Sequence, residues 1–142
     1  MRVTVHTDGA ARGNPGPAGA GAVVYDERGR VLAEVARGLG EATNNVAEYT
    51  AVILGLERAR ALGAREVVVR TDSQLLVQQL RGRYRVRSAR LRPLHARVEE
   101  LARAFDEVRF EHVPRDRNVT ADRLANRGVD AWLERRSGAG AG

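Results

Sequence analysis

The stretch EVVVRTDS, residues 66–73, decides how this sequence folds. Three consecutive valines at 67–69 predict a strand that is buried on both faces. Asp72 follows that strand directly, and a short helix is expected over 73–80. A fully buried strand that runs straight into a helix is typical of α/β proteins whose sheets contain parallel strands.

The segments on either side of this strand complete a βββαβαβα order. Val3 and Val5 alternate with polar residues, which is typical of a half-buried strand. Residues 9–21 hold five glycines and two prolines and are expected to form a loop. The remaining elements are expected to be strands over 22–25, 31–37 and 107–113, and helices over 44–62, 91–105 and 119–133. The result is an α/β fold with a five-stranded mixed sheet (three antiparallel, then parallel strands) and helices on both faces.

Composition narrows the class of protein further. The chain has 142 residues with a net charge of +6, and all 24 of its basic residues are arginine. One guanidinium group can bind two phosphate oxygens at once, so the arginines favour a polyanionic partner. The alternative is that the charge only keeps the protein in solution. The absence of cysteine excludes disulfides, cysteine-ligated zinc and thiol nucleophiles.

Length and hydropathy predict one domain. Residues 1–134 are expected to form it, followed by a flexible tail rich in Arg, Gly and Ala at 135–142. No window of the sequence approaches the length of a transmembrane helix, and no secretory signal is visible, so no membrane partner is expected. A monomer working in the cytoplasm is the expectation.

Four acids lie at the ends of the expected elements. Asp8 ends the first strand, Glu48 lies in the first turn of the long helix, Asp72 ends the buried strand and Asp122 lies in the first turn of the last helix. Each has a structural alternative, because carboxylates also cap helices or complement helix dipoles, and Asp8 before Gly9 is an ordinary turn pair.

The topology favours a common site for these acids. If the first strand and the strand that ends at Asp72 are parallel neighbours, both carboxylates lie at the carboxyl edge of the sheet, where α/β proteins bind ligands. Four carboxylates together would repel and raise one another's pKa values. Divalent cations relieve this repulsion, and all-oxygen ligands favour Mg²⁺ or Mn²⁺.

From about residue 2 to residue 132 the sequence resembles ribonuclease H of type 1, in the short form typical of archaeal and some bacterial members. The segments that carry the resemblance are Thr7-Asp8-Gly9 with Gly13-Asn14-Pro15-Gly16, then Thr43-Asn44-Asn45-Val46-Ala47-Glu48, then Thr71-Asp72-Ser73, and last Asn118 to Asp122 with Leu124-Ala125. Four blocks in the family's order, each on the expected element, make the resemblance specific.

The resemblance implies a ribonuclease H-like fold and an endonuclease that cleaves the RNA strand of RNA/DNA hybrids to 5′-phosphate and 3′-hydroxyl ends. Asp8, Glu48, Asp72 and Asp122 would be the metal-binding acids, with Asp8 bridging two Mg²⁺ ions; Mn²⁺ is an alternative. One ion would activate the attacking water, and the other would stabilise the departing 3′ oxygen.

The resemblance also assigns residues to substrate binding. Asn14, Asn44 and Asn45 are expected to contact the hybrid backbone, where recognition of the 2′-hydroxyl distinguishes RNA from DNA. Gly9 and Gly13 would let the two backbones approach closely. The structural alternatives are a turn at Asn14 and helix capping by Asn44 and Asn45.

Two departures from the family pattern stand out. Many members carry a histidine in the loop before the last acid, whereas residues 113–118 here read VPRDRN. Arg115 is expected to contact the scissile phosphate or the leaving end instead, acting only through its charge. His112 precedes this loop and is expected to belong to the strand.

The second departure is a shortened segment at 80–91. Many relatives carry an extra helix and a basic protrusion here, whereas this chain has arginines alternating with other residues. In an extended segment Arg83 and Arg85 would lie on one side and Tyr84 on the other, which suggests a reduced phosphate-binding strip. A solvated linker is the alternative.

Three other functions are alternatives to a hybrid-specific endonuclease. The alternative of a different class is a catalytically weak module that binds hybrid or duplex RNA, although such a module would be expected to lack at least one acid. A 3′–5′ exonuclease would be expected to carry Asp-x-Glu on the first strand, where this chain has Asp8-Gly9-Ala10. A nucleotide-binding enzyme is disfavoured because no Gly-x-Gly-x-x-Gly segment follows the first strand.

Overall fold

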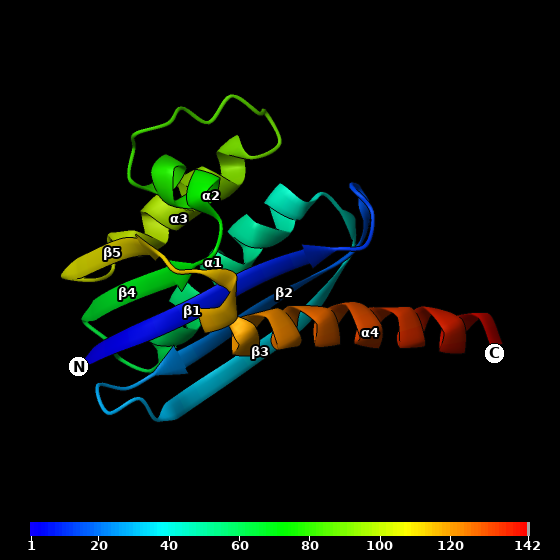
Figure 1. The fold of residues 1–142 in the computed structure, drawn as a ribbon, viewed down its shortest axis with the longest axis horizontal. Coiled ribbons are helices and arrows are strands. Elements are labelled where there is room, and N and C mark those ends of the chain that lie inside the picture. The colour runs from blue at the N-terminus through cyan, green and yellow to red at the C-terminus, as the bar shows by residue number, and fades with distance from the viewer. Residues whose placement is uncertain (142) are drawn as a thin grey trace.

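A five-stranded sheet forms the centre of the molecule in the computed structural model, which describes residues 1–141 (Figure 1). The strand order is β3-β2-β1-β4-β5. The first three strands pair antiparallel, and β4 and β5 join β1 in parallel. The strands span Arg2–Ala11 (β1), Gly16–Tyr25 (β2), Val31–Ala42 (β3), Glu66–Thr71 (β4) and Glu107–His112 (β5). The predicted mixed sheet is therefore confirmed.

Helices cover both faces of the sheet, as predicted (Figure 1). On one face α1 packs across β1 and β2, with α2 and α3 beside it, and α4 lies on the other face over β1, β2 and β3. The helices span Asn44–Ala61 (α1), Gln74–Leu80 (α2), Arg92–Ala102 (α3) and Val119–Ala141 (α4), and a short 3-10 helix, η1, spans Arg115–Arg117.

The glycine-rich segment is mostly strand, so the prediction of a loop over 9–21 is wrong. β1 continues to Ala11 and β2 begins at Gly16, which leaves only a tight turn between them. The reason is packing: a Cβ atom at Gly21 would lie 2.4 Å from the Ala121 carbonyl oxygen of α4. The glycines of β2 thus let α4 rest directly on the sheet backbone, a contact that local sequence rules do not anticipate.

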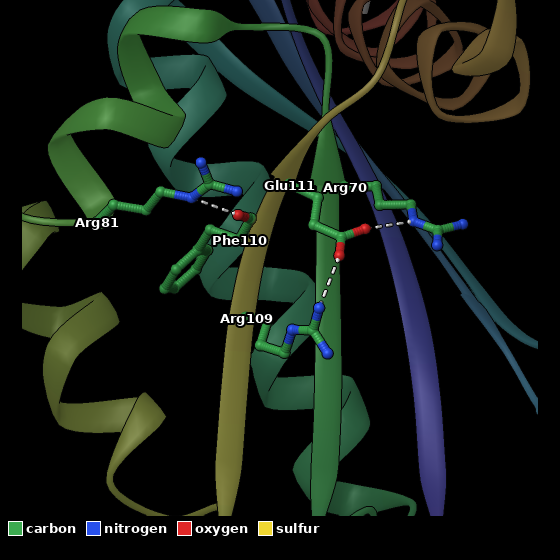
Figure 2. A network of polar contacts seen from close by, with 5 residues as sticks. All are labelled: Arg70, Arg81, Arg109, Phe110 and Glu111. Carbon is green, nitrogen blue, oxygen red and sulfur yellow. Dashed lines mark hydrogen bonds and ion pairs between the residues drawn. The ribbon is translucent and has the colours of Figure 1, made fainter.

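β4 is buried on one face only, contrary to the prediction. Val67 and Val69 are buried toward the α1 side, whereas Val68 is half-buried on the opposite face, because α4 packs on β1, β2 and β3 and leaves β4 uncovered. Charged side chains occupy this open face. Glu111 of β5 accepts from Arg70 Nε of β4 at 3.1 Å and from Arg109 Nη2 at 3.4 Å (Figure 2).

Arg81 protects the outer edge of the sheet. Its Nε donates to the carbonyl oxygen of Phe110 in the edge strand β5 at 2.8 Å (Figure 2). Exposed edge strands offer free carbonyl and N–H groups to other chains, and a guanidinium bound to one of those carbonyls discourages such pairing.

The last helix extends further than the expected end at Leu133. α4 runs to Ala141, across the boundary that composition suggests near residue 134. Trp132 packs against Gly38 of β3, and the Arg136 guanidinium lies 5.3 Å from the centre of the Trp132 ring. Gly142 and the side chains of residues 139–141 lie outside the described residues. No helix within the described part of the chain is long and apolar enough to span a membrane.

Candidate active site

Three of the four predicted acids converge at the carboxyl edge of the sheet. The parallel pairing of β1 with β4 runs through His6 and Arg70, and Asp8 and Asp72 each lie two residues beyond that last pair. Glu48 enters from α1 just past the first turn of that helix, so the expectation of a first-turn position is off by one residue. One carboxylate oxygen from each of Asp8, Glu48 and Asp72 lies within 4.8 Å of the others.

Local sequence explains how Glu48 reaches this cluster. The Thr43 hydroxyl caps α1 by accepting from the Val46 N–H at 3.2 Å. Gly9 then lets the start of α1 lie against β1, since a Cβ atom at Gly9 would be 2.3 Å from the Glu48 nitrogen. The capping-box alternative for Glu48 is therefore wrong, because Thr43 caps the helix and Glu48 points to the sheet edge.

Asp72 likewise is not a helix cap. The Ser73 hydroxyl caps α2 and accepts from the Leu76 N–H at 3.2 Å. The helix-capping roles considered for Glu48 and Asp72 are thus performed by the neighbouring hydroxyl residues Thr43 and Ser73. The carboxylates of Glu48 and Asp72 are left to face each other and Asp8.

The cluster carries strong electrostatic repulsion. Burial, followed by the charges of Glu48 and Asp72, raises the pKa of Asp8 to about 9. Burial and the charge of Asp72 raise the pKa of Glu48 to about 8, against the opposing effect of the Gly9 N–H. The Glu48 Oε2 atom is buried with no hydrogen-bond partner. A divalent cation would satisfy this oxygen and remove the repulsion, so the donor set fits such an ion.

Asp122 lies beside this three-acid cluster. Asp122 contributes to the raised pKa of Asp8, although it is not among the three acids whose oxygens lie within 4.8 Å of one another. Asp122 is exposed and sits in the first turn of α4, as predicted. Its carboxylate is within hydrogen-bond distance of Asn126 in the next turn, where Asn126 Nδ2 donates to Asp122 Oδ1 at 3.3 Å.

Asn118 anchors the start of α4 to the acid-bearing strand. Its side-chain Nδ2 donates to the Thr7 carbonyl oxygen at 2.9 Å, and both residues are buried. The pairing joins residues 111 positions apart in the chain. The sequence motif contains Asn118, but only the tertiary structure shows that it fixes Asp122 relative to Asp8.

Arg115 lies at the edge of the acid cluster. Its Nε is 3.9 Å from Asp72 Oδ2, its side chain is 91% exposed, and its charge lowers the pKa of Glu48. Arg115 lies in η1 between β5 and α4. His112 is exposed at the end of β5, in the strand as predicted. The exposed guanidinium is thus free to contact an incoming phosphate.

The asparagines expected to bind substrate lie together at the start of α1. Asn14 Oδ1 accepts from the Asn44 backbone N–H at 3.0 Å, which holds the β1–β2 turn against α1. Gly13 in this turn has φ +103°, which favours glycine. A groove of about 260 Å³ lies beside them. Its lining includes Asn14, Thr43, Asn45, Ser88 and Arg90.

Sequence reasoning did not place Ser88 and Arg90 beside these asparagines. Both residues come from the segment between α2 and α3, which projects from the body of the molecule (Figure 1). Nothing in their local sequence signals the contact, because it depends on how that whole segment folds back toward α1.

The basic segment at 81–87 is only partly extended. Gly82, with φ +75°, turns the chain over the end of α2, and the Arg83 N–H donates to the Gln78 carbonyl oxygen at 2.9 Å. Arg83, Tyr84 and Arg85 then line one groove of about 560 Å³ against α3. The turn at Gly82 means that the segment is not extended from its start, and the phosphate-binding strip of Arg83 and Arg85 stays a prediction.

Comparison with known proteins gives a consistent assignment. The reverse transcriptase-like family matches residues 6–128. The bifunctional protein Rv2228c of Mycobacterium tuberculosis is 49% identical over 132 residues, which are 92% of this chain and 36% of that protein. The structure of RNase H1 from Halobacterium salinarum is 44% identical with a TM-score of 0.89, covering 92% of this chain and 99% of the other.

A third similar structure includes nucleic acid. LC11-RNase H1 in complex with an RNA/DNA hybrid is 42% identical with a TM-score of 0.88, over 92% of this chain and 99% of the other. The chain belongs to the ribonuclease H family. It spans about a third of the length of the mycobacterial relative.

Proposed function

We propose that this chain is an endoribonuclease that hydrolyses the RNA strand of RNA/DNA hybrids. The observation that carries the proposal is the convergence of Asp8, Glu48 and Asp72 within 4.8 Å at the carboxyl edge of a ribonuclease H sheet. The likeness to LC11-RNase H1, whose structure holds an RNA/DNA hybrid, supports hybrid as the substrate. Duplex RNA as a second substrate stays a prediction.

The proposed cofactor is Mg²⁺, bound as two ions in the presence of substrate. Asp8, Glu48 and Asp72 would hold the ions, because their carboxylates lie within 4.8 Å of one another and buried Glu48 Oε2 has no other partner. Asp122, whose side chain contributes to the raised pKa of Asp8, would complete the site from α4. The chemistry that such ions supply is acidification of a water molecule and stabilisation of the leaving 3′ oxygen. The products would then carry 5′-phosphate and 3′-hydroxyl ends.

The protein's own groups position the substrate and tune the charge of the site. Asn14, Asn44 and Asn45 are exposed beside the acid cluster, where their amides can donate to and accept from the sugar–phosphate backbone. The close packing of Gly9 against α1 keeps Asp8 beside Glu48. Gly13 shapes the turn that presents Asn14.

Two groups of arginines would supply positive charge to the substrate phosphates. Arg115 extends from η1 near Asp72 and would act on the phosphate next to the cleaved bond. Arg83 and Arg85 are exposed on the segment between α2 and α3 and would contact phosphates further along the duplex. Use of Mn²⁺ in place of Mg²⁺, a monomeric state and a cytoplasmic location stay predictions.

One cleavage assay tests the proposal. A labelled RNA strand is supplied as RNA/DNA hybrid, as duplex RNA and as single strand, with Mg²⁺ or with EDTA. We expect internal cuts in the hybrid that require the metal and disappear in Asp72→Asn. Asp106→Asn is the matched control, because Asp106 lies before β5 at the opposite end of the sheet and its side chain makes an exposed ion pair with Arg65.

The same assay distinguishes the alternative function. Retained hybrid binding without cleavage in any metal would indicate a binding module and contradict the proposal. Equal cleavage of hybrid by wild type and Asp72→Asn would show that the cutting does not depend on the carboxylate cluster.

A further inference from the structure

An arginine of the β1–β2 turn contacts a polar stripe of α4 that begins at an active-site acid. Asp122, Asn126 and Asp130 lie four residues apart on one side of the helix. Arg12 faces this stripe: its Nη1 is 2.8 Å from Asp130 Oδ1, and its Nη2 donates to Asn126 Oδ1 at 3.3 Å. The contact joins residues 114 positions apart in the sequence.

The chemistry of these groups fixes the orientation of the Asn126 amide. A guanidinium can only donate hydrogen bonds, so the amide oxygen of Asn126 must face Arg12. The amide nitrogen therefore faces Asp122, where it donates to the main-chain oxygen at 3.0 Å and to carboxylate Oδ1 at 3.3 Å. A flipped amide would direct its oxygen at the carboxylate and repel it.

Arg12 is itself held in place by the turn that carries Asn14. The Arg12 N–H donates to the Pro17 carbonyl oxygen at 2.9 Å and closes this turn. Asn14 in the same turn accepts from the Asn44 N–H at the start of α1. One continuous set of contacts thus joins α4, the β1–β2 turn and α1 around the acid cluster.

We infer that Arg12 and Asn126 are positioning residues that orient the Asp122 carboxylate for metal binding. This inference rests on the proposed function, in which Asp122 is a metal ligand. Asp122 is exposed, so without the Asn126 donor its side chain is free to sample rotamers directed into solvent. Arg12 acts one step further out, by keeping the amide nitrogen of Asn126 turned toward Asp122.

The expected effect is on metal affinity more than on hybrid binding. Removal of a hydrogen-bond partner behind a metal ligand reduces affinity or activity by about 10- to 100-fold, and these partly exposed groups belong near the lower limit. Asn126→Ala and Arg12→Ala should each weaken Mn²⁺ binding by about tenfold. The double variant should bind Mn²⁺ little more weakly than either single variant, because both residues act through one hydrogen bond.

The experiment measures Mn²⁺ binding to the full chain by the electron paramagnetic resonance signal of the free ion. The Mg²⁺ concentration for half-maximal hybrid cleavage and the affinity for hybrid in EDTA are measured alongside. Asn126→Asp retains an acceptor for Arg12 but removes the donor to Asp122, so it should behave like Asn126→Ala. Arg127→Ala, an exposed arginine on the same helix, is the control.

The outcomes separate this inference from the proposed function. A rise in both metal midpoints with unchanged hybrid affinity in EDTA for the Asn126 variants supports the positioning role. Unchanged Mn²⁺ affinity in Asn126→Ala, Asn126→Asp and Arg12→Ala overturns it, whether or not the wild-type chain cleaves hybrid. The inference would also be overturned if Asn126→Asp binds metal as tightly as wild type while Asn126→Ala binds it more weakly. The hydrogen bond from the Asn126 amide to Asp122 would then have no effect on metal binding.

Discussion

Replacing Glu48 by glutamine should stabilise the metal-free protein at neutral and alkaline pH, even though it removes a carboxylate of the proposed metal site. Glu48 is 5% exposed, and the pKa of its carboxyl is raised from an ordinary value of 4.5 to about 8. Between these two pH values the folded protein retains a proton that the unfolded chain has released. The free energy of unfolding of the wild type therefore falls as the pH rises through this window.

The size of the effect follows from the width of the window. One retained proton changes the free energy of unfolding by about 1.4 kcal/mol per pH unit, so the ceiling between pH 5 and pH 8 is roughly 4 kcal/mol. Glutamine removes this titration and also the charge that helps to raise the pKa of Asp8. We expect the stability of Glu48→Gln relative to wild type to rise by about 2–4 kcal/mol from pH 5 to pH 8.

Urea unfolding in EDTA at the two pH values measures this difference directly. Glu134→Gln, an exposed acid of α4, is the matched control and should show little pH-dependent change. Saturating Mg²⁺ should stabilise the wild type more than the variant, because it compensates the charge of the cluster. A Glu48→Gln variant that is less stable relative to wild type at pH 8 than at pH 5 would refute the reasoning.

Three further predictions follow from the site. Gly9→Ala should cost about 1–3 kcal/mol of stability or more, because its Cβ would collide with the backbone of Ala47 and Glu48. A lower melting temperature and weaker Mn²⁺ binding would show this effect. A normal melting temperature and normal Mn²⁺ binding would show that α1 tolerates displacement. Arg115→Ala should lower the turnover number on hybrid markedly, and nearly full activity would assign this exposed guanidinium no catalytic part. Removing Arg83 and Arg85 together should reduce the slope of log K against log salt concentration for hybrid binding. The reduction should be up to about 0.9 for each phosphate that is no longer neutralised. An unchanged slope would indicate that the segment is a solvated linker.

The sequence by itself determined the order of the elements and the identity of the acids. Period-2 alternation at 2–7, the valine run at 67–69 and the amphipathic pattern over 44–62 are local signals, and each produced the expected strand or helix. Asp8 and Asp72 could be placed together because β1 and β4 run parallel, although the expectation that Asp8 ends its strand is wrong. β1 continues to Ala11, and only its pairing with β4 stops at His6.

Only the tertiary structure decided which faces are covered and which side chains support the acids. The glycines of β2 form a strand because α4 packs on them, and Val68 is partly exposed because that helix does not reach β4. The contacts of Asn118 with Thr7 and of Arg12 with Asn126 join residues more than a hundred positions apart. Local periodicity reports on neighbours within a turn or two, whereas these contacts exist only after the sheet and α4 have packed together.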